Sequence, residues 1–338
     1  MRSYKNLFEK ICSFENLHLA YLKARTCKRY RSYILEFSFY LEENLLKLQE
    51  ELQNQTYQHG RYREFIIHDS KKRHIKAAPF RDRVVHHALC NIIEPIFDKG
   101  FIYDSYACRK GKGTHRGVKR LQKFLKNELN KYCLKCDISK YFESIDHQIL
   151  LSIIQKKISD KKTIWLIREI LESTCEEPGK GIPIGNLTSQ LFANIYLNEL
   201  DQFVKHRLRV RYYLRYMDDF LILGKEKSYL WGILREIQKF LNNNLSLKLH
   251  PKKVQILPVR KGIDFLGYRV FKDYRLLRKS TVKRFIKRTK VYQKKLSQGL
   301  ISREKFKASL QSWKGYAIHA NSWRLRKSLS EKLRINLF

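Results

Sequence analysis

The chain has 338 residues, and its 70 lysines and arginines against 32 aspartates and glutamates give a formal charge of +38. Because the basic residues run along the whole length, we expect a polyanionic partner, and nucleic acid is the natural one. No run of eighteen apolar residues occurs and no apolar stretch follows the N-terminus, so neither a membrane span nor a signal peptide is predicted.

The first part of the chain predicts a helical extension, then a hairpin and a long helix. Residues 1–60 have the apolar spacing of amphipathic helices. Strand-like runs at 62–68 and 73–78 flank a turn, and a helix is expected from about Arg81. Pro95 is expected to end or kink that helix, because proline removes a backbone donor and clashes with the preceding turn.

A glycine-broken basic loop, residues 106–114, precedes a helix expected to begin near His115. Backbone amides, a helix N-terminus and cations together favour a bound phosphate. The glycine spacing is not that of a P-loop. A solvated basic turn is the alternative interpretation.

Asp137 follows the apolar run 132–134 and ends what is expected to be a strand. Taken alone, this carboxylate fits a helix N-cap equally well. A functional role for Asp137 depends on whether a second acidic strand occurs farther along the chain.

Seven cysteines are scattered without the spacing of a disulfide framework, which favours reduced thiols in a cytoplasmic compartment. Cys133 and Cys136 have the spacing of half a zinc site, but no second pair accompanies them. Positions three apart on a strand face opposite sides. We therefore interpret both cysteines as core residues.

Residues 183–190 form a turn that opens a helix, with Thr188 or Ser189 as the expected cap. Gly185 permits close backbone approach to a ligand or base pair. An ordinary junction between loop and helix is the alternative for this segment alone.

The most informative motif is Tyr216-Met217-Asp218-Asp219, which lies at the tip of a predicted hairpin between two apolar runs. Two adjacent carboxylates repel each other, and a divalent cation removes that cost. With Asp137, three carboxylates from two strands are suited to two Mg²⁺ ions, which prefer oxygen ligands. Such ions activate a 3′-hydroxyl and stabilise leaving pyrophosphate.

The C-terminal part predicts a basic helical region. Residues 274–303 contain eleven lysines and arginines and no acid, with an apolar seam around Phe285. Phosphate contact along a duplex is the expected use, and a solvated helix face is the weaker alternative. We expect Trp313, Tyr316 and Trp323 to pack in the core rather than stack on bases.

From about residue 30 to residue 335, the order of these elements resembles that of reverse transcriptases. Asp137 to Phe142 looks like the first catalytic motif of the palm. Residues 181–190 look like the motif that contacts dNTP and template, and Tyr216 to Asp219 looks like the hairpin that carries the metal ligands.

Four further segments are similar to family motifs. Residues 247–253 resemble the lysine-bearing motif, with Lys253 in the lysine position and Lys252 adjacent to it. Residues 262–268 look like the primer-grip hairpin. Lys71 to Arg83 resembles the fingers motif that holds the triphosphate, and Arg109 falls where the second fingers motif has an arginine.

The resemblance implies an α+β, right-hand polymerase fold with fingers, a palm of antiparallel sheet plus helices, and a helical thumb. Length and a hydrophobic fraction of 43% fit two or three subdomains packed together. We expect an N-terminal helical extension over 1–60, fingers over 61–130, a palm over 131–272 with interleaved helices, and a basic helical thumb over 273–338.

The resemblance also implies the site residues. Asp137, Asp218, Asp219 and the carbonyl of Ile138 would bind two Mg²⁺ ions, with Mn²⁺ as a substitute, and Lys253 would protonate pyrophosphate. Phe142 would exclude the ribose 2′-hydroxyl. The expected nucleotide contacts are Lys71, Arg73, Arg109, Phe142, Ile184, Gly185 and Gln190. The expected nucleic-acid contacts are Tyr216, Met217, Gly267, Lys283, Lys287 and Arg288.

Within the family, the chain most resembles the enzymes of diversity-generating retroelements, encoded by bacteria or phages. Ile184 and Gln190 stand where most reverse transcriptases have a glutamine and a proline. This resemblance implies mutagenic retrohoming, in which a template RNA is copied from a DNA or RNA primer with dNTPs and frequent errors opposite adenine. A small helical accessory protein is an expected further partner.

Two alternatives remain open. A retron or group II intron type of reverse transcriptase would need a dedicated structured RNA or a maturase segment, and no such segment is visible. A catalytically silent RNA-binding or defence protein with an inherited palm is the other. The presence of all three carboxylates argues against that second alternative.

Overall fold

The computed structural model describes residues 3–68, 72–173 and 177–338. Within these residues, helices surround three separate antiparallel sheets. The mixture of helices and antiparallel sheet is the α+β class predicted from the sequence.

The N-terminal segment is helical, as expected. Amphipathic spacing explains its packing, since α4 buries Leu45, Leu48 and Leu52 on one face. At the start of α2, the Ser13 side chain accepts a hydrogen bond from the Asn16 amide and caps the helix. The helices are α1 (Phe8–Cys12), α2 (Phe14–Ala24), α3 (Ser32–Phe39) and α4 (Leu41–Gln53).

A two-stranded hairpin and a long helix follow. Strand β1 (Arg63–His68) pairs with β2 (Lys72–Ala77), as predicted. Helix α5 (Phe80–Asp98) then packs against α2. Pro95 was expected to end or kink this helix; it does not end it, because α5 continues to Asp98. The proline lies in the last turn, where its missing donor removes little of the backbone ladder.

A four-stranded sheet has the strand order β4-β5-β3-β6. All three pairings are antiparallel. The strands are β3 (Tyr132–Asp137), β4 (Tyr213–Tyr216), β5 (Asp219–Gly224) and β6 (Gln255–Pro258). Alternating side chains of the central strands enter two different cores, because successive residues of a strand face opposite sides.

One face of this sheet shares a large core with the N-terminal helices and with α9 (Leu187–Gln202) and α10 (Lys227–Leu245). The other face shares a second core with α6 (Thr114–Leu125) and the C-terminal elements. Cys136 belongs to the first core and Cys133 to the second. Both are buried free thiols, as predicted.

Two further helices, α7 (His147–Gln155) and α8 (Lys161–Glu172), complete the first core. Asp146 caps α7 through the amide of Ile149, and Asp160 caps α8. Cys175 lies outside the described residues.

The C-terminal part begins with a three-stranded sheet of β7 (Ile263–Phe265), β8 (Tyr268–Val270) and β9 (Arg275–Leu277). The division expected at 272/273 falls inside this sheet. Three helices follow: α11 (Lys279–Ser297), α12 (Arg303–Ala317) and α13 (Trp323–Leu333).

The aromatic residues of these helices differ in burial. Phe285 of α11 stacks on Trp313 of α12 with ring centroids 3.8 Å apart, so Trp313 is a core residue as predicted. The same expectation for Trp323 is wrong, since its side chain is 58% exposed at the start of α13.

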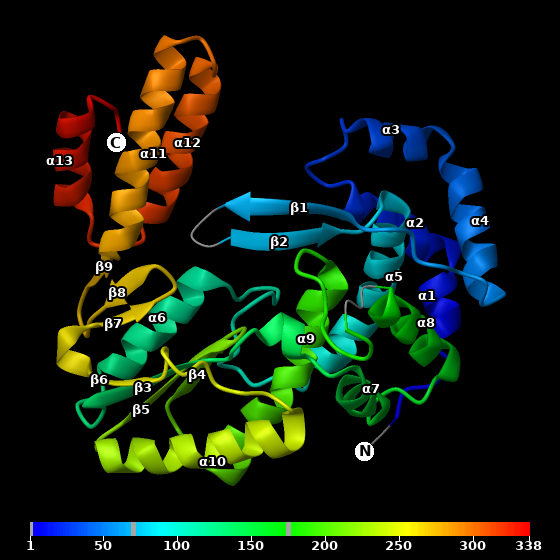
Figure 1. Ribbon diagram of the computed structural model, residues 1–338, viewed down its shortest axis with the longest axis horizontal. Helices are drawn as coiled ribbons and strands as arrows, with labels where there is room; N and C mark the ends of the chain where they lie inside the picture. The colour runs from blue at the N-terminus through cyan, green and yellow to red at the C-terminus, as the bar shows by residue number, and fades with distance from the viewer. Residues whose placement is uncertain (1–2, 69–71, 174–176) are drawn as a thin grey trace.

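Figure 1 shows how these parts are arranged. The N-terminal helices and α5 lie on one side of the molecule, and the bundle α11–α13 stands on the opposite side. The hairpin β1–β2 extends from the helical side toward that bundle. In this view, the four-stranded sheet and α10 lie below the hairpin and the bundle.

Candidate active site

Three carboxylates lie at one end of the four-stranded sheet. Asp137 ends β3 and is paired directly with Asp219, which begins β5. Asp218 precedes Asp219 in the two-residue turn of the β4–β5 hairpin, where Met217 has a φ of +56°. The motifs singled out in the sequence are thus joined by strand pairing, although Asp137 and Asp219 are 82 positions apart in the chain.

The charge of Asp219 is only partly compensated. Burial raises the pKa of Asp219 to about 6, Asp137 and Asp218 add to the rise, and Lys135 opposes it. The Lys135 ammonium lies 3.5 Å from Asp219 Oδ2. Asp219 Oδ1 is buried and has no hydrogen-bond partner. An acceptor left unpaired in this way is suited to a cation.

A second lysine contacts the facing carboxylate. Lys253 Nζ donates a hydrogen bond to Asp137 Oδ1. The segment that carries it lies along the end of β3, because the His250 amide donates to the Asp137 carbonyl at 2.8 Å. Of the two adjacent lysines considered from the sequence, the structure therefore places Lys253 on the carboxylate.

The donor set fits a divalent cation. Among the described residues, no three histidine, cysteine, aspartate or glutamate side chains are already gathered around one metal position. Three carboxylates nevertheless share one sheet end, and Asp219 Oδ1 is an unpaired oxygen of the kind that Mg²⁺ prefers. Ile138 follows directly, and its amide donates to the Asp218 carbonyl at 3.3 Å.

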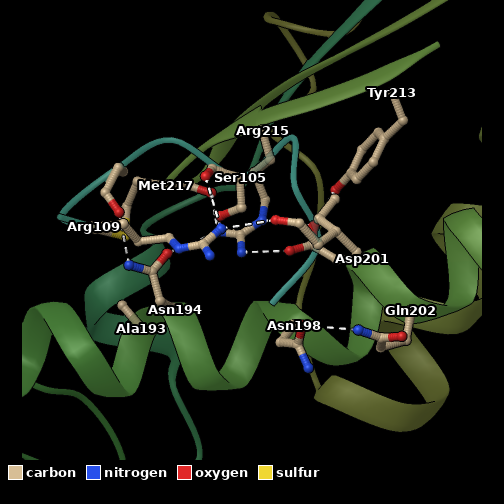
Figure 2. Close-up of polar contacts among 12 residues, drawn as sticks. Ser105, Arg109, Ala193, Asn194, Asn198, Asp201, Gln202, Tyr213, Arg215 and Met217 are labelled. Carbon is tan, nitrogen blue, oxygen red and sulfur yellow. Dashed lines mark hydrogen bonds and ion pairs between the residues drawn. The ribbon is translucent and has the colours of Figure 1, made fainter. Parts of the chain in front are cut away.

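Behind the turn lies a buried polar network that the sequence did not suggest (Figure 2). Arg215 and Asp201 have fully buried side chains and form a two-pronged ion pair, with N–O distances of 2.7 and 2.6 Å. Arg215 Nη1 also donates to Asn194 Oδ1 and to the Met217 carbonyl. A charged residue inside an apolar strand is the signal that could have found it, since buried charges are paired.

The segment 181–190 joins the hairpin β1–β2 to the short helical turn after Asp137. The Ile182 amide donates to the Phe142 carbonyl at 2.8 Å, and the Lys76 amide donates to the Ile184 carbonyl at 3.3 Å. Gly185 has a φ of +124°, and a Cβ there would lie 3.1 Å from Ile75. Both the left-handed backbone and the close approach of β2 require glycine.

A groove of about 900 Å³ opens beside this segment. Gly185 and Gln190 line it, and the aromatic side chains of Tyr33 and Phe65 contribute. None of the three carboxylates lines the groove. Its basic residues come from the N-terminal extension, the hairpin and α5: Lys28, Arg31, Arg61, Arg63 and Arg83.

Arg109 is placed differently from its expected role. Its guanidinium donates to Asp98 Oδ1 at 2.6 Å and to the carbonyls of Ile102 and Ser105. The side chain is 8% exposed. With its donors already engaged by the protein, Arg109 supports the fold near the site and does not present an open fork to a nucleotide.

The remaining predicted contacts are spread over the molecule. Tyr216 contacts the hydroxyl of Thr114 at 3.2 Å, and Met217 is buried in the hairpin turn. Gly267 lies under Tyr316, whose hydroxyl would be 2.0 Å from a Cβ at that position. Arg73 is an exposed residue of β2. Lys71 lies outside the described residues. Three exposed cations, Lys283, Lys287 and Arg288, lie on α11.

Comparison with known proteins places this site in a family context. Residues 67–270 match the family model described as reverse transcriptase (RNA-dependent DNA polymerase). Protein YkfC of Escherichia coli (strain K12) is 26% identical over 245 residues, which cover 60% of this chain and 64% of that protein. The group II intron-encoded protein LtrA of Lactococcus lactis subsp. cremoris is 26% identical over 315 residues, covering 72% of this chain and 51% of that protein.

This chain thus spans about half to two thirds of the length of these relatives. Among solved structures, apo telomerase from Candida tropicalis matches 64% of this chain and 48% of its own, with a TM-score of 0.48 and 12% identity. A partial Cas6-RT-Cas1–Cas2 complex matches 72% of this chain and 43% of its own, with a TM-score of 0.39 and 19% identity. In the part of the chain that the structure describes, no helix is long and apolar enough to cross a membrane.

Proposed function

The chain belongs to the reverse transcriptase (RNA-dependent DNA polymerase) family, and from that premise we propose that it is an active RNA-directed DNA polymerase that synthesises cDNA on a template RNA. The family match and the arrangement of helices and antiparallel sheets establish the right-hand polymerase fold expected from the sequence. Activity, template and primer are the parts that we propose.

The observation that carries the proposal is the pairing of Asp137 with Asp219 beside Asp218, with Asp219 Oδ1 buried and unpaired. These residues and the Ile138 carbonyl would bind two Mg²⁺ ions, or Mn²⁺ in their place. When bound, such ions activate the primer 3′-hydroxyl and stabilise the leaving pyrophosphate. Without a bound cation, the repulsion among these carboxylates would only destabilise the folded protein.

The other residues bind and orient the substrates. Lys253 donates a hydrogen bond to Asp137, and this contact supports the proposal that it gives a proton to pyrophosphate. Arg73, an exposed residue of β2, neutralises the triphosphate together with Lys71 or Lys72. Phe142 supplies an apolar wall against the ribose 2′-hydroxyl, because a hydroxyl in a filled apolar slot has neither space nor partner.

The basic groove beside Gly185 and Gln190 is suited to the template strand. Five cations line it together with Tyr33 and Phe65. Cationic side chains that follow a phosphate backbone, combined with aromatic rings on which bases stack, are typical of surfaces that bind single strands. The exposed cations of α11 are suited to the duplex product.

We further propose that the enzyme is of the diversity-generating retroelement type and makes frequent errors opposite template adenine. Ile184 supports this proposal. Its carbonyl accepts a hydrogen bond from the Lys76 amide, which ties this position to β2. A glutamine here would offer a directional hydrogen bond, whereas the aliphatic side chain of isoleucine offers none. Without that bond, discrimination against misfit geometry rests on shape alone.

Ile184→Gln tests the subtype. We expect the variant to misincorporate less often opposite adenine, because the amide restores a directional check. The measurement is sequencing of cDNA made on one RNA template by wild type and variant, with errors opposite the other three bases as the internal control. An unchanged error frequency at adenine would contradict the proposal.

Primer extension tests the polymerase itself. The assay uses an RNA template, a DNA primer, dNTPs and Mg²⁺, with wild type beside Asp218→Asn. We expect extension by the wild type only. Accurate extension would keep the polymerase and favour a retron or group II intron type. Absence of extension, with the cognate RNA and any accessory protein added, would favour the silent RNA-binding alternative.

A further inference from the structure

We propose that Arg215, clamped by Asp201, is a positioning residue that fixes the turn carrying Asp218 and Asp219. The effect of Arg215 on catalysis rests on the proposed function. The clamp itself can be tested without any polymerase activity.

The guanidinium is shared between an anchor and the turn (Figure 2). Nε and Nη2 donate to the two oxygens of Asp201 at 2.7 and 2.6 Å. Nη1 donates to Asn194 Oδ1 at 3.2 Å and to the Met217 carbonyl at 3.1 Å. A rigid planar fork can make these contacts together, whereas an ammonium group cannot.

The hydrogen bond to the Met217 carbonyl orients the main chain that leads into Asp218. That carbonyl belongs to the planar peptide unit that joins Met217 to Asp218. Holding the oxygen therefore sets the orientation of the plane from which the Asp218 main chain continues. Met217 has a φ of +56°, a left-handed conformation that a residue with a side chain adopts only when its surroundings impose it.

The anchor is tied to the scaffold and not only to the hairpin. Asn194 and Asp201 lie on α9, two turns apart and so on one face of the helix. Tyr213 donates its hydroxyl to Asp201 Oδ1 at 2.7 Å, and Asn194 Nδ2 donates to the Ala107 carbonyl at 2.9 Å. The clamp therefore joins the turn to α9 and to the segment before α6.

The charge state supports this arrangement. Burial of Arg215 disfavours its charge, but the Asp201 carboxylate outweighs burial and raises the pKa of the guanidinium above its ordinary value. Both side chains are completely buried, so solvent neither screens the pair nor competes for its hydrogen bonds. The Met217 carbonyl thus faces a permanent, fixed donor.

If the Arg215–Asp201 pair only stabilised the fold, removing it would have a different result from the one that the positioning role predicts. Apolar residues of similar volume often replace a buried ion pair without loss of stability. The triple variant Asp201→Leu, Tyr213→Phe, Arg215→Leu removes the pair and the hydroxyl that depends on it, and it adds no methionine. If the pair served only stability, a folded triple variant would keep a normal turn and normal catalysis.

The chain offers a specific reporter for the turn, because Met1 and Met217 are its only methionines. Protein labelled with ¹³C at the methionine methyl groups therefore gives one signal from the turn and one from the N-terminus. The control variant is Tyr57→Phe, which removes a comparable buried hydroxyl that donates to Asp82 at 2.6 Å. Thermal unfolding verifies that each variant is folded.

We expect the Met217 methyl signal of the triple variant to move toward the position of an unstructured methionine or to broaden, with no such change in Tyr57→Phe. We also expect the rate of single-nucleotide incorporation to fall about 100-fold, while hybrid affinity stays within about twofold, because misplacement of a reacting group by about 1 Å costs a factor of this size. Arg215→Lys, which keeps the charge beside Asp201, is the second variant and should show the same pattern.

An unchanged Met217 signal in folded Arg215→Lys and in the folded triple variant would overturn the proposal, and so would wild-type incorporation rates in both. If the triple variant does not fold, Arg215→Lys decides alone. A wild type without polymerase activity would contradict the proposed function but leave the methyl signal as a test of the clamp.

Discussion

Asp219 shows most clearly how one residue connects the sequence to the proposed chemistry. Its side chain is held in a partly buried position near two other carboxylates, and Lys135 opposes the repulsion that acts on it. Proteins retain such destabilising arrangements at functional sites. The charge of Asp219 should therefore lower the free energy of unfolding when no divalent cation is present.

We predict that Asp219→Asn is more stable than the wild type in EDTA at pH 8, by on the order of 1 kcal/mol. The folded-state pKa of about 6 lies above the ordinary 3.8, so folding favours the neutral carboxyl. The stabilising contribution is fully present below about pH 3.8 and is lost as pH rises through about 6. The difference between variant and wild type should therefore shrink on acidification.

Denaturant unfolding of both proteins at pH 5 and pH 8 gives the measurement, with the exposed Asp273→Asn as control. Saturating Mg²⁺ should raise the midpoint of the wild type more than that of Asp219→Asn. A variant that is no more stable than the wild type at pH 8 would contradict the explanation.

At the residue scale, local sequence motifs were sufficient for some positions and insufficient for others. Asp137, Asp218 and Asp219 stand out because acidic residues at the ends of apolar runs are unusual. Arg215 and Lys135 were missed because their partners, Asp201 and Asp219, are distant in the chain and only strand pairing and helix packing bring them close. Arg109 matched a motif position, but its contacts with Asp98 became visible only in the fold.

At the element scale, α11 carries a surface whose charge has no counterpart on the same helix. Its sequence, from Lys279 to Ser297, contains no acid, and its buried face packs through Phe285 on Trp313. The exposed Lys283 and Lys287 are one turn apart and so lie on one face of the helix. Such a row of cations is suited to phosphates along a duplex.

We predict that Lys283→Glu combined with Lys287→Glu weakens binding of an RNA–DNA hybrid and reduces the salt dependence of that binding. Each lost phosphate contact should lower the slope of log affinity against log salt by roughly 0.9, the value for B-form DNA. Fluorescence anisotropy at several salt concentrations measures both quantities.

The matched control for this pair is Lys161→Glu with Lys162→Glu at the start of α8, which lies on the opposite side of the molecule in Figure 1. This control changes the net charge equally. An equal loss of affinity in both double variants would mean that net charge, and not the α11 surface, determines binding.

Element boundaries followed from the sequence where patterns are local. The hairpin of β1 and β2 and the start of α5 agree with the predictions within two residues. The beginning of α9 does not, because Asn186 occupies the cap position and the helix starts at Leu187, ahead of Thr188 and Ser189. Both hydroxyl residues are buried instead, which depends on tertiary contacts that local propensity does not contain.

At the scale of the whole molecule, the four-stranded sheet is the boundary between two cores. One core holds the N-terminal helices, α9 and α10, and the other holds α6, the small sheet and the C-terminal helices. Asp137 and Asp219 lie at the ends of β3 and β5, and both strands contribute side chains to the two cores. The sequence indicated which residues are apolar, but the assignment of each to one core requires the long-range pairing of β3 with β5 and β6.

This arrangement explains how a strongly basic chain accommodates an acidic site. The formal charge of +38 is spread over the surface, while the three carboxylates are concentrated at one sheet end with Lys135 and Lys253 beside them. Nucleic acid is attracted by the surface as a whole. The chemistry that we propose would take place at this sheet end, where the three carboxylates lie together.

Single-nucleotide incorporation on an RNA template, measured beside hybrid affinity for the wild type and Asp218→Asn, tests the central claim most directly. We predict that affinity changes by less than about twofold while the rate falls by several orders of magnitude, because the carboxylate is needed only for the chemical step. Asp273→Asn should match the wild type in both. An incorporation rate that Asp218→Asn leaves unchanged would contradict the claim that these carboxylates form the active site of an RNA-directed DNA polymerase.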